Sequence, residues 1–157
     1  MSRKGADVGQ PDERPAPASN NRCNSTALRK ATRRVSQLYD SILAPTGLRS
    51  TQRAILHNIN YFGSPTVGKL AASLVLDRSA LGHNLKPLER EGLLTLEPDP
   101  NDRRSRIARL TEKGMKKLAD SAPYWQMAQE RFESKFGVER AAALREVLAI
   151  IATEEFE

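Results

Sequence analysis

The sequence predicts a mainly α-helical fold with one small β-hairpin, and three observations support this prediction. Apolar residues recur at steps of three and four through most of the 157 residues, which is the spacing of an amphipathic helix. Glycine and proline residues separate these stretches. Two short apolar runs, residues 93–96 and 107–110, flank a polar turn and predict a single hairpin.

The first two helices are predicted from their apolar stripes and their ends. The first helix spans residues 24–43 and ends before Pro45 and Gly47. Its narrow apolar stripe consists of Leu28, Ala31, Val35, Leu38 and Ile42. The second helix spans residues 50–62 and ends at Gly63.

The middle of the chain has the element order of a winged helix-turn-helix. Thr66 is the predicted cap of a short helix. Asp77 is the predicted cap of a further helix, which runs from Arg78 to about Glu91 and is followed by the hairpin. Two helices joined by a tight turn and then a hairpin are typical of this DNA-binding motif.

Two helices complete the chain, at residues 111–136 and 139–155. The inward apolar face of the last helix is predicted to contain Ala143, Leu144, Val147, Leu148 and Ile151. A small lobe offers this face few interior neighbours, so a partner chain is its simplest cover.

Composition favours a polyanionic partner. The net charge is +6, which indicates nucleic acid first and an anionic membrane second. The single cysteine, Cys23, excludes an intramolecular disulfide and suits a reducing compartment. No apolar run approaches the roughly 18 residues of a membrane span. Residues 1–20 are rich in proline, have no secretory signal and predict a disordered tail, so we expect a cytoplasmic protein without membrane contact.

The helix that begins at Arg78 has the two faces that a DNA-recognition helix needs. Leu81, Leu85 and Leu88 gather on one side and are expected to pack on the core. Small residues and hydrogen-bond donors occupy the other side, where they allow close approach and reach bases and phosphates. The candidate DNA contacts of this helix are Arg78, Ser79, Gly82, His83, Lys86 and Arg90.

The hairpin tip is a second candidate DNA contact. Its candidate residues are Asp102, Arg103, Arg104 and Arg106. A narrow minor groove attracts arginine because it focuses negative potential. Asp102 is best explained as a partner that orients a neighbouring arginine, since a lone carboxylate is repelled by DNA.

Four motifs resemble the MarR family of regulators. They are GLRSTQRAIL at residues 47–56, the LxxLExxGLL pattern at 85–94, DxR at 102–104 and LTEKG at 110–114. Each is weak alone, but the four in order are specific. The sequence departs from the pattern at Gly82 and His83, where many members have threonine and arginine, a departure that concerns base preference rather than docking.

The resemblance implies a homodimer with a ligand cleft. One domain, residues 21–157, has its winged helix-turn-helix at 48–110 and its dimerisation helices at 24–44 and 111–157. The cleft lies between the dimer region and the DNA-binding lobes. Arg104 enters the minor groove, and Asp102 holds it.

The sequence therefore predicts a sequence-specific transcription regulator, a homodimeric, ligand-responsive repressor of a pseudo-palindromic operator in double-stranded DNA. His57, Tyr39 and Trp125 are weak candidates for binding the effector, for which family analogy suggests a small aromatic acid. No catalytic constellation or metal-ligand spacing is visible, so we expect neither an enzyme nor a cofactor.

Two alternatives remain open. One is an organic peroxide sensor, because such members of the family carry a cysteine at the start of the first helix and a tyrosine where Tyr39 lies. Alignment on the first helix, however, places Ser25 rather than Cys23 at the sensing position. The other alternative is a winged-helix module that binds protein, although such modules lack a basic recognition face.

Overall fold

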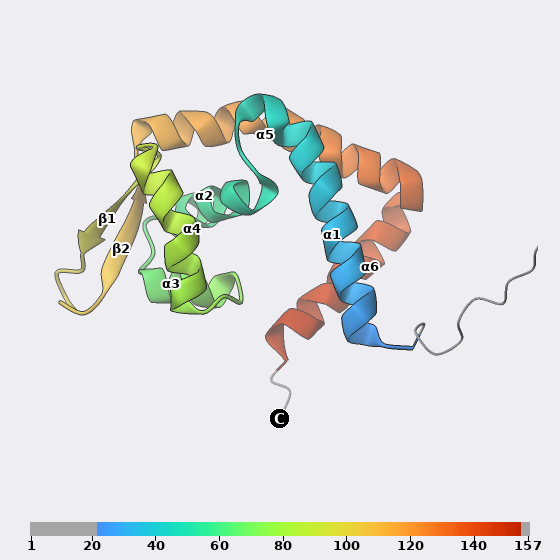
Figure 1. The fold of residues 1–157 in the computed structure, drawn as a ribbon, viewed down its shortest axis with the longest axis horizontal. Helices are drawn as coiled ribbons and strands as arrows, with labels where there is room; N and C mark the ends of the chain where they lie inside the picture. Colours follow the sequence, from blue (N-terminus) through green and yellow to red (C-terminus); the bar gives the residue numbers. More distant parts are fainter. Residues whose placement is uncertain (1–21, 155–157) are drawn as a thin grey trace, which may run out of the picture. The chain divides into compact units, whose positions relative to one another are not determined.

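The structure is a computed structural model that describes residues 22–154 (Figure 1). The tail predicted for residues 1–20 lies outside these residues. The chain divides between Arg34 and Val35, inside helix α1 (Asn24–Leu43), and the two parts are described separately. In the first part, Cys23 is exposed, and Thr26 Oγ1 donates a hydrogen bond to its Sγ at 3.3 Å.

The second part contains the rest of α1 and all other elements. They are the 3₁₀ helix η1 (Ala44–Thr46), α2 (Ser50–Phe62), α3 (Val67–Ser73), α4 (Arg78–Arg90), β1 (Leu94–Pro98), β2 (Arg106–Leu110), α5 (Glu112–Phe136) and α6 (Val138–Thr153). This order confirms the predicted fold class. Among residues 22–154, no helix combines the length and the apolarity needed to cross a bilayer.

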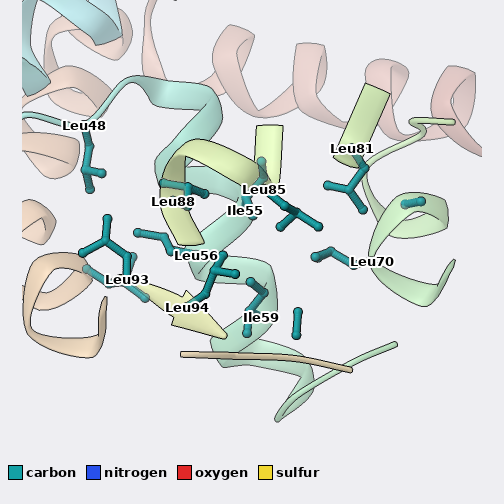
Figure 2. Packing of buried hydrophobic residues seen from close by; sticks show 13 residues of the cluster. Leu48, Ile55, Leu56, Ile59, Leu70, Leu81, Leu85, Leu88, Leu93 and Leu94 are labelled. Atoms are coloured by element: carbon teal, nitrogen blue, oxygen red, sulfur yellow. The ribbon is translucent and has the colours of Figure 1, made fainter. Parts of the chain in front are cut away.

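One cluster of buried side chains holds α2, α3, α4 and the hairpin together (Figure 2). The cluster consists of Leu48, Ile55, Leu56, Ile59, Leu70, Ala71, Leu81, Leu85, Leu88, Leu93, Leu94, Ala108 and Leu118. Each fully buried leucine or isoleucine stabilises the fold by about 1.5–3 kcal/mol relative to leaving it in water. The cluster therefore fixes the orientation of α4 relative to α2, α3 and the hairpin.

The hairpin is antiparallel and is bonded to the start of α3. Its register pairs Leu94 with Leu110 and Pro98 with Arg106, so β1 extends two residues into the stretch that was predicted as turn. The Ala108 amide donates to the Pro65 carbonyl at 2.9 Å. The hairpin is thus anchored at its base, while its tip projects away from α5 in the view of Figure 1.

A short, closely packed connection joins the hairpin to α5. It explains why the LTEKG motif has threonine and glycine at these positions. Thr111 caps α5 by accepting from the Gly114 amide at 3.0 Å, and its hydroxyl donates to the Gly92 carbonyl at 2.6 Å. A Cβ atom added at Gly114 would lie 1.9 Å from the Leu93 carbonyl oxygen. Only glycine fits at this position without moving the backbone.

The apolar face predicted for α6 is not covered within the single chain. Leu144, Val147, Leu148 and Ile151 are 44%, 54%, 38% and 37% exposed, and Ala143 is exposed as well. The reason is that α6 packs on α5, and Ala141 is its buried residue. The apolar face exists, but the described part of this chain does not cover it.

Candidate nucleic-acid interface and adjoining cavity

Helix α4 is fixed at its start and along its inner side. Asp77 Oδ1 accepts a hydrogen bond from the Ala80 amide at 2.7 Å and so caps the helix. Leu81, Leu85 and Leu88 are 0%, 1% and 0% exposed, as the helical pattern predicted. The opposite side of α4 is therefore held in a defined orientation.

That opposite side is polar, cationic and open. The exposed residues on it are Arg78, Ser79, His83, Lys86 and Arg90, together with the carboxylate of Glu89 at its edge. Gly82 lies among them, and a Cβ atom added there would meet nothing within 4 Å, so the space above the backbone is open at this point. Asn84 instead donates a hydrogen bond to the Ala80 carbonyl within the helix at 2.9 Å.

The hairpin tip is a closed turn that projects arginines into solvent. The Asp99 amide donates to the Ser105 carbonyl at 3.1 Å, and the Ser105 amide donates to the Asp102 carbonyl at 2.9 Å. Arg103 and Arg104 are exposed, and within residues 22–154 neither guanidinium forms an ion pair. A long cation on a rigid turn is suited to reaching into a groove.

Asp102 contacts Arg104 through the backbone of that residue. Its Oδ1 accepts a hydrogen bond from the backbone amide of Arg104 at 2.9 Å, and within residues 22–154 no ion pair joins Asp102 to an arginine side chain. A short carboxylate side chain readily bonds the amide two residues further on, which closes the turn. Asp102 thus fixes the backbone of Arg104 and does not orient its guanidinium group.

The other two arginines of the hairpin hold the strands. Arg109 Nε pairs with Glu97 Oε2 at 3.0 Å, and its Nη1 donates to Ser64 Oγ at 3.2 Å. Arg106 Nη1 donates to the Leu96 carbonyl at 3.3 Å. These contacts stiffen the strands behind the tip and partly occupy both guanidinium groups.

A cavity of about 360 Å³ opens beside α2. It is lined by Tyr39, Leu43, Ser50, Arg53, Ala54, His57, Asn58 and Trp125. The three weak effector candidates of the sequence, Tyr39, His57 and Trp125, therefore line one space. Burial raises the pKa of Tyr39, whose hydroxyl donates a hydrogen bond to Gln129.

Arg53 is the charged residue in the wall of this cavity. Its Nε donates to Ser121 Oγ at 3.1 Å, and Ser121 is completely buried. Its guanidinium carbon lies 4.9 Å from the centroid of the Trp125 ring. Burial lowers the pKa of Arg53, and within residues 22–154 no carboxylate forms an ion pair with it.

Known proteins are similar to this chain in both sequence and fold. The sequence model of the MarR family matches residues 48–105, from α2 to the hairpin tip. The transcriptional regulator MosR of M. tuberculosis, solved in complex with DNA, is 30% identical, with a TM-score of 0.70 over 84% of this chain and 99% of that one.

This chain belongs to the MarR family. The transcriptional repressor CouR, solved on a 23-mer DNA duplex, is 29% identical, with a TM-score of 0.75 over 83% of this chain and 92% of CouR. The HTH-type transcriptional regulator MhqR of Bacillus subtilis is 25% identical over 130 residues, which are 83% of this chain and 79% of MhqR.

Within this MarR-family fold, the sequence-predicted residues form three groups. The α4 group and the hairpin-tip group occupy elements that pack on one core, whereas the effector candidates lie in the cavity. Sequence reasoning missed Arg53. Its position four residues before His57 on α2 was a usable signal, because that spacing places both side chains on one face of a helix.

A metal centre has no support among the described residues. Within residues 22–154, no group of three or more histidine, cysteine, aspartate or glutamate side chains lies close enough together to hold a metal ion.

Proposed function

We propose that this MarR-family protein is a homodimeric, ligand-responsive repressor that binds a pseudo-palindromic operator in double-stranded DNA. The observation that carries the proposal is the open cationic side of α4, held by its buried leucines next to a hairpin that projects Arg103 and Arg104. A cationic helix face and an arginine-tipped wing match the major and minor grooves of a duplex. MosR and CouR, which share the fold, were solved on DNA.

The proposed DNA contacts divide by element. On α4 they are Arg78, Ser79, Gly82, His83, Lys86 and Arg90, and on the wing they are Asp102, Arg103, Arg104 and Arg106. Asp102 contributes through the turn that it closes, and the others contribute side chains or a close approach of the backbone.

A salt titration tests the DNA-binding part of this proposal. The probe is a duplex selected with the wild-type protein from a random-sequence library. We expect its affinity to fall steeply between 50 and 200 mM salt, because each phosphate contact releases counterions. A protein-binding module of the same fold would select no duplex, and that outcome would reject the proposal.

The dimer part of the proposal rests on the uncovered face of α6. Residues 24–44 and 111–157 are the proposed dimerisation helices. A second copy that covers Val147, Ile150 and Ile151 would remove from water side chains that are 54%, 59% and 37% exposed in the single chain. A two-fold dimer also presents two recognition helices, which matches a two-fold operator.

The ligand part rests on the cavity and on Arg53. A half-buried guanidinium without a carboxylate partner in the described residues favours an anionic ligand, and the Trp125 ring favours a flat one. The proposed effector is therefore a small aromatic acid.

Fluorescence tests the ligand directly, because Trp125 is the single tryptophan of the chain. Titration with 4-hydroxybenzoate is expected to change the emission of Trp125 and to weaken DNA binding. Benzyl alcohol, which lacks the carboxylate, is the control and is expected to do neither. Equal responses to both compounds would argue against recognition of an anion by Arg53.

A further inference from the structure

The turn between α3 and α4 has the hydrogen bonds of a helix end that normally requires glycine. The Leu76 amide donates to the Ala71 carbonyl at 2.9 Å, and the Val75 amide donates to the Ala72 carbonyl at 3.1 Å. These two bonds define the motif in which the residue after the helix is left-handed, and that residue is usually glycine. Here it is Val75.

Val75 is a strained residue at this position. Its φ is +52°, and the one other non-glycine with positive φ in the described part of the chain is Ser64. A β-branched side chain is especially unfavourable in this conformation, because its Cβ crowds the backbone. Glycine would close the same turn without that strain.

Packing within the described residues does little to offset this strain. Val75 is 68% exposed, so most of its isopropyl group lies in water. A strained conformation that persists without packing suggests that the side chain acts outside the chain.

The position of the turn indicates where that action takes place. Val75 precedes the cap Asp77 by two residues and the exposed Arg78 and Ser79 by three and four. It therefore lies at the N-terminal end of α4. This is the end of a recognition helix whose residues reach base edges in helix-turn-helix proteins.

We propose that Val75 is a DNA-contacting residue whose isopropyl group packs on an apolar group of the duplex, either a thymine methyl or a deoxyribose. This inference rests on the proposed function, because it presumes that α4 enters the major groove. It adds an apolar contact to a face that is otherwise mainly polar, and apolar contact with the thymine methyl is an established way to read a base.

Three variants at one position test the proposal against the duplex selected with the wild-type protein. Val75→Gly and Val75→Ala are each expected to weaken binding about fivefold, since both remove the two methyl groups that the duplex would cover. Val75→Ile keeps them and is expected to bind within about twofold of the wild type. Binding to a random-sequence duplex at low salt is the control and is expected to change less.

Thermal unfolding without DNA separates this role from a structural one. Val75→Gly is expected to unfold at the wild-type temperature or about 2–4 °C above it, because it relieves the left-handed strain. Val75→Ala keeps that strain and is expected to unfold below Val75→Gly. A Val75→Gly protein that is clearly less stable than the wild type would place the role of the valine inside the fold and overturn the proposal.

Uracil substitution distinguishes the two apolar partners. If Val75 meets a thymine methyl, replacing that thymine by uracil weakens the wild type and leaves Val75→Gly unaffected. If it meets a deoxyribose, no uracil position has this effect. Wild-type affinity for Val75→Gly on the selected duplex would reject the contact alone, whereas failure of the wild type to select any duplex would reject the proposed function and this inference with it.

Discussion

In the winged core of residues 48–110, the aliphatic side chains on the inner faces of α2 and α4 are buried, whereas most of those along α6 are exposed. In the core, Ile55, Leu56 and Leu85 are 2%, 0% and 1% exposed. On α6, Val147 and Ile150 are 54% and 59% exposed. Similar residues at helical spacing thus have opposite environments in one chain. The difference teaches that one copy of the chain buries the inner faces of α2 and α4 by itself, whereas its described part leaves the apolar face of α6 uncovered.

The largest expected effect concerns the junction that closes the core. Gly114→Ala should lower the free energy of unfolding by about 3 kcal/mol or more, because its Cβ would overlap the Leu93 carbonyl oxygen and force the backbone apart. Chemical denaturation measures this loss. The matched control is Gly82→Ala, also inside a helix but with open space around the new Cβ, which should raise stability by up to about 1 kcal/mol. Similar values for the two variants would contradict the steric explanation.

The next largest effect concerns the exposed apolar face of α6. The double substitution Val147→Asp and Ile151→Asp should weaken the dimer at least about a hundredfold, because it places two charges where two apolar side chains would be covered. The single chain should still fold, since both positions are exposed in it. Light scattering across micromolar concentrations measures the change.

A charge control makes that experiment specific. Arg140→Asp alters the charge of the same helix at a polar, exposed position and should leave the dimer intact. A wild-type protein that is already monomeric at these concentrations would reject the proposed role of α6.

A smaller effect is expected at the proposed DNA-binding surface. Arg104→Ala should weaken binding to the selected duplex by more than about tenfold with the fold intact, because a minor-groove insertion is lost. Lys86→Ala should instead weaken binding to all duplexes about equally and reduce the salt slope by roughly one unit, as expected for one phosphate contact. Titrations against the selected duplex and a random duplex separate the two patterns. Unchanged affinity of Arg104→Ala for the selected duplex would contradict the role of the wing.

The local features of the core were predictable because they depend on neighbours in the sequence. The limits of α1 and α2, the caps Thr66 and Asp77 and the buried face of α4 all follow from helical spacing and short-range hydrogen bonds. The role of Asp102 is also local, yet it has two possible partners in Arg104, and its carboxylate accepts a hydrogen bond from the backbone amide of that residue.

Features that depend on distant parts of the chain were not predictable. Arg53 becomes a cavity residue because α5 brings Trp125 and Ser121 against α2. The exposure of α6 depends on what else packs there, and periodicity predicts an apolar face without predicting its cover. The left-handed conformation of Val75 can likewise be recognised only in the structure, since the sequence alone does not show that this residue occupies a position usually taken by glycine.

The smallest expected effect lies at the start of α1, outside the winged core. Cys23 is exposed, and a hydrogen bond from Thr26 Oγ1 lowers the pKa of its thiol, with further lowering by backbone hydrogen bonds. A lower pKa means more thiolate at neutral pH, so the residue should be oxidisable.

Oxidation of Cys23 should nevertheless leave DNA binding unchanged. An exposed side chain can take up oxygen and remain in water, and the chain has no second cysteine to form an intramolecular disulfide. The affinity for the selected duplex is therefore expected to agree within about twofold for the wild type and Cys23→Ser, each with and without an organic hydroperoxide, because no charge at the DNA-facing surface changes. Release of the wild type by peroxide, with Cys23→Ser still bound, would instead identify the protein as a peroxide sensor. It would also show that the start of α1 controls the winged core.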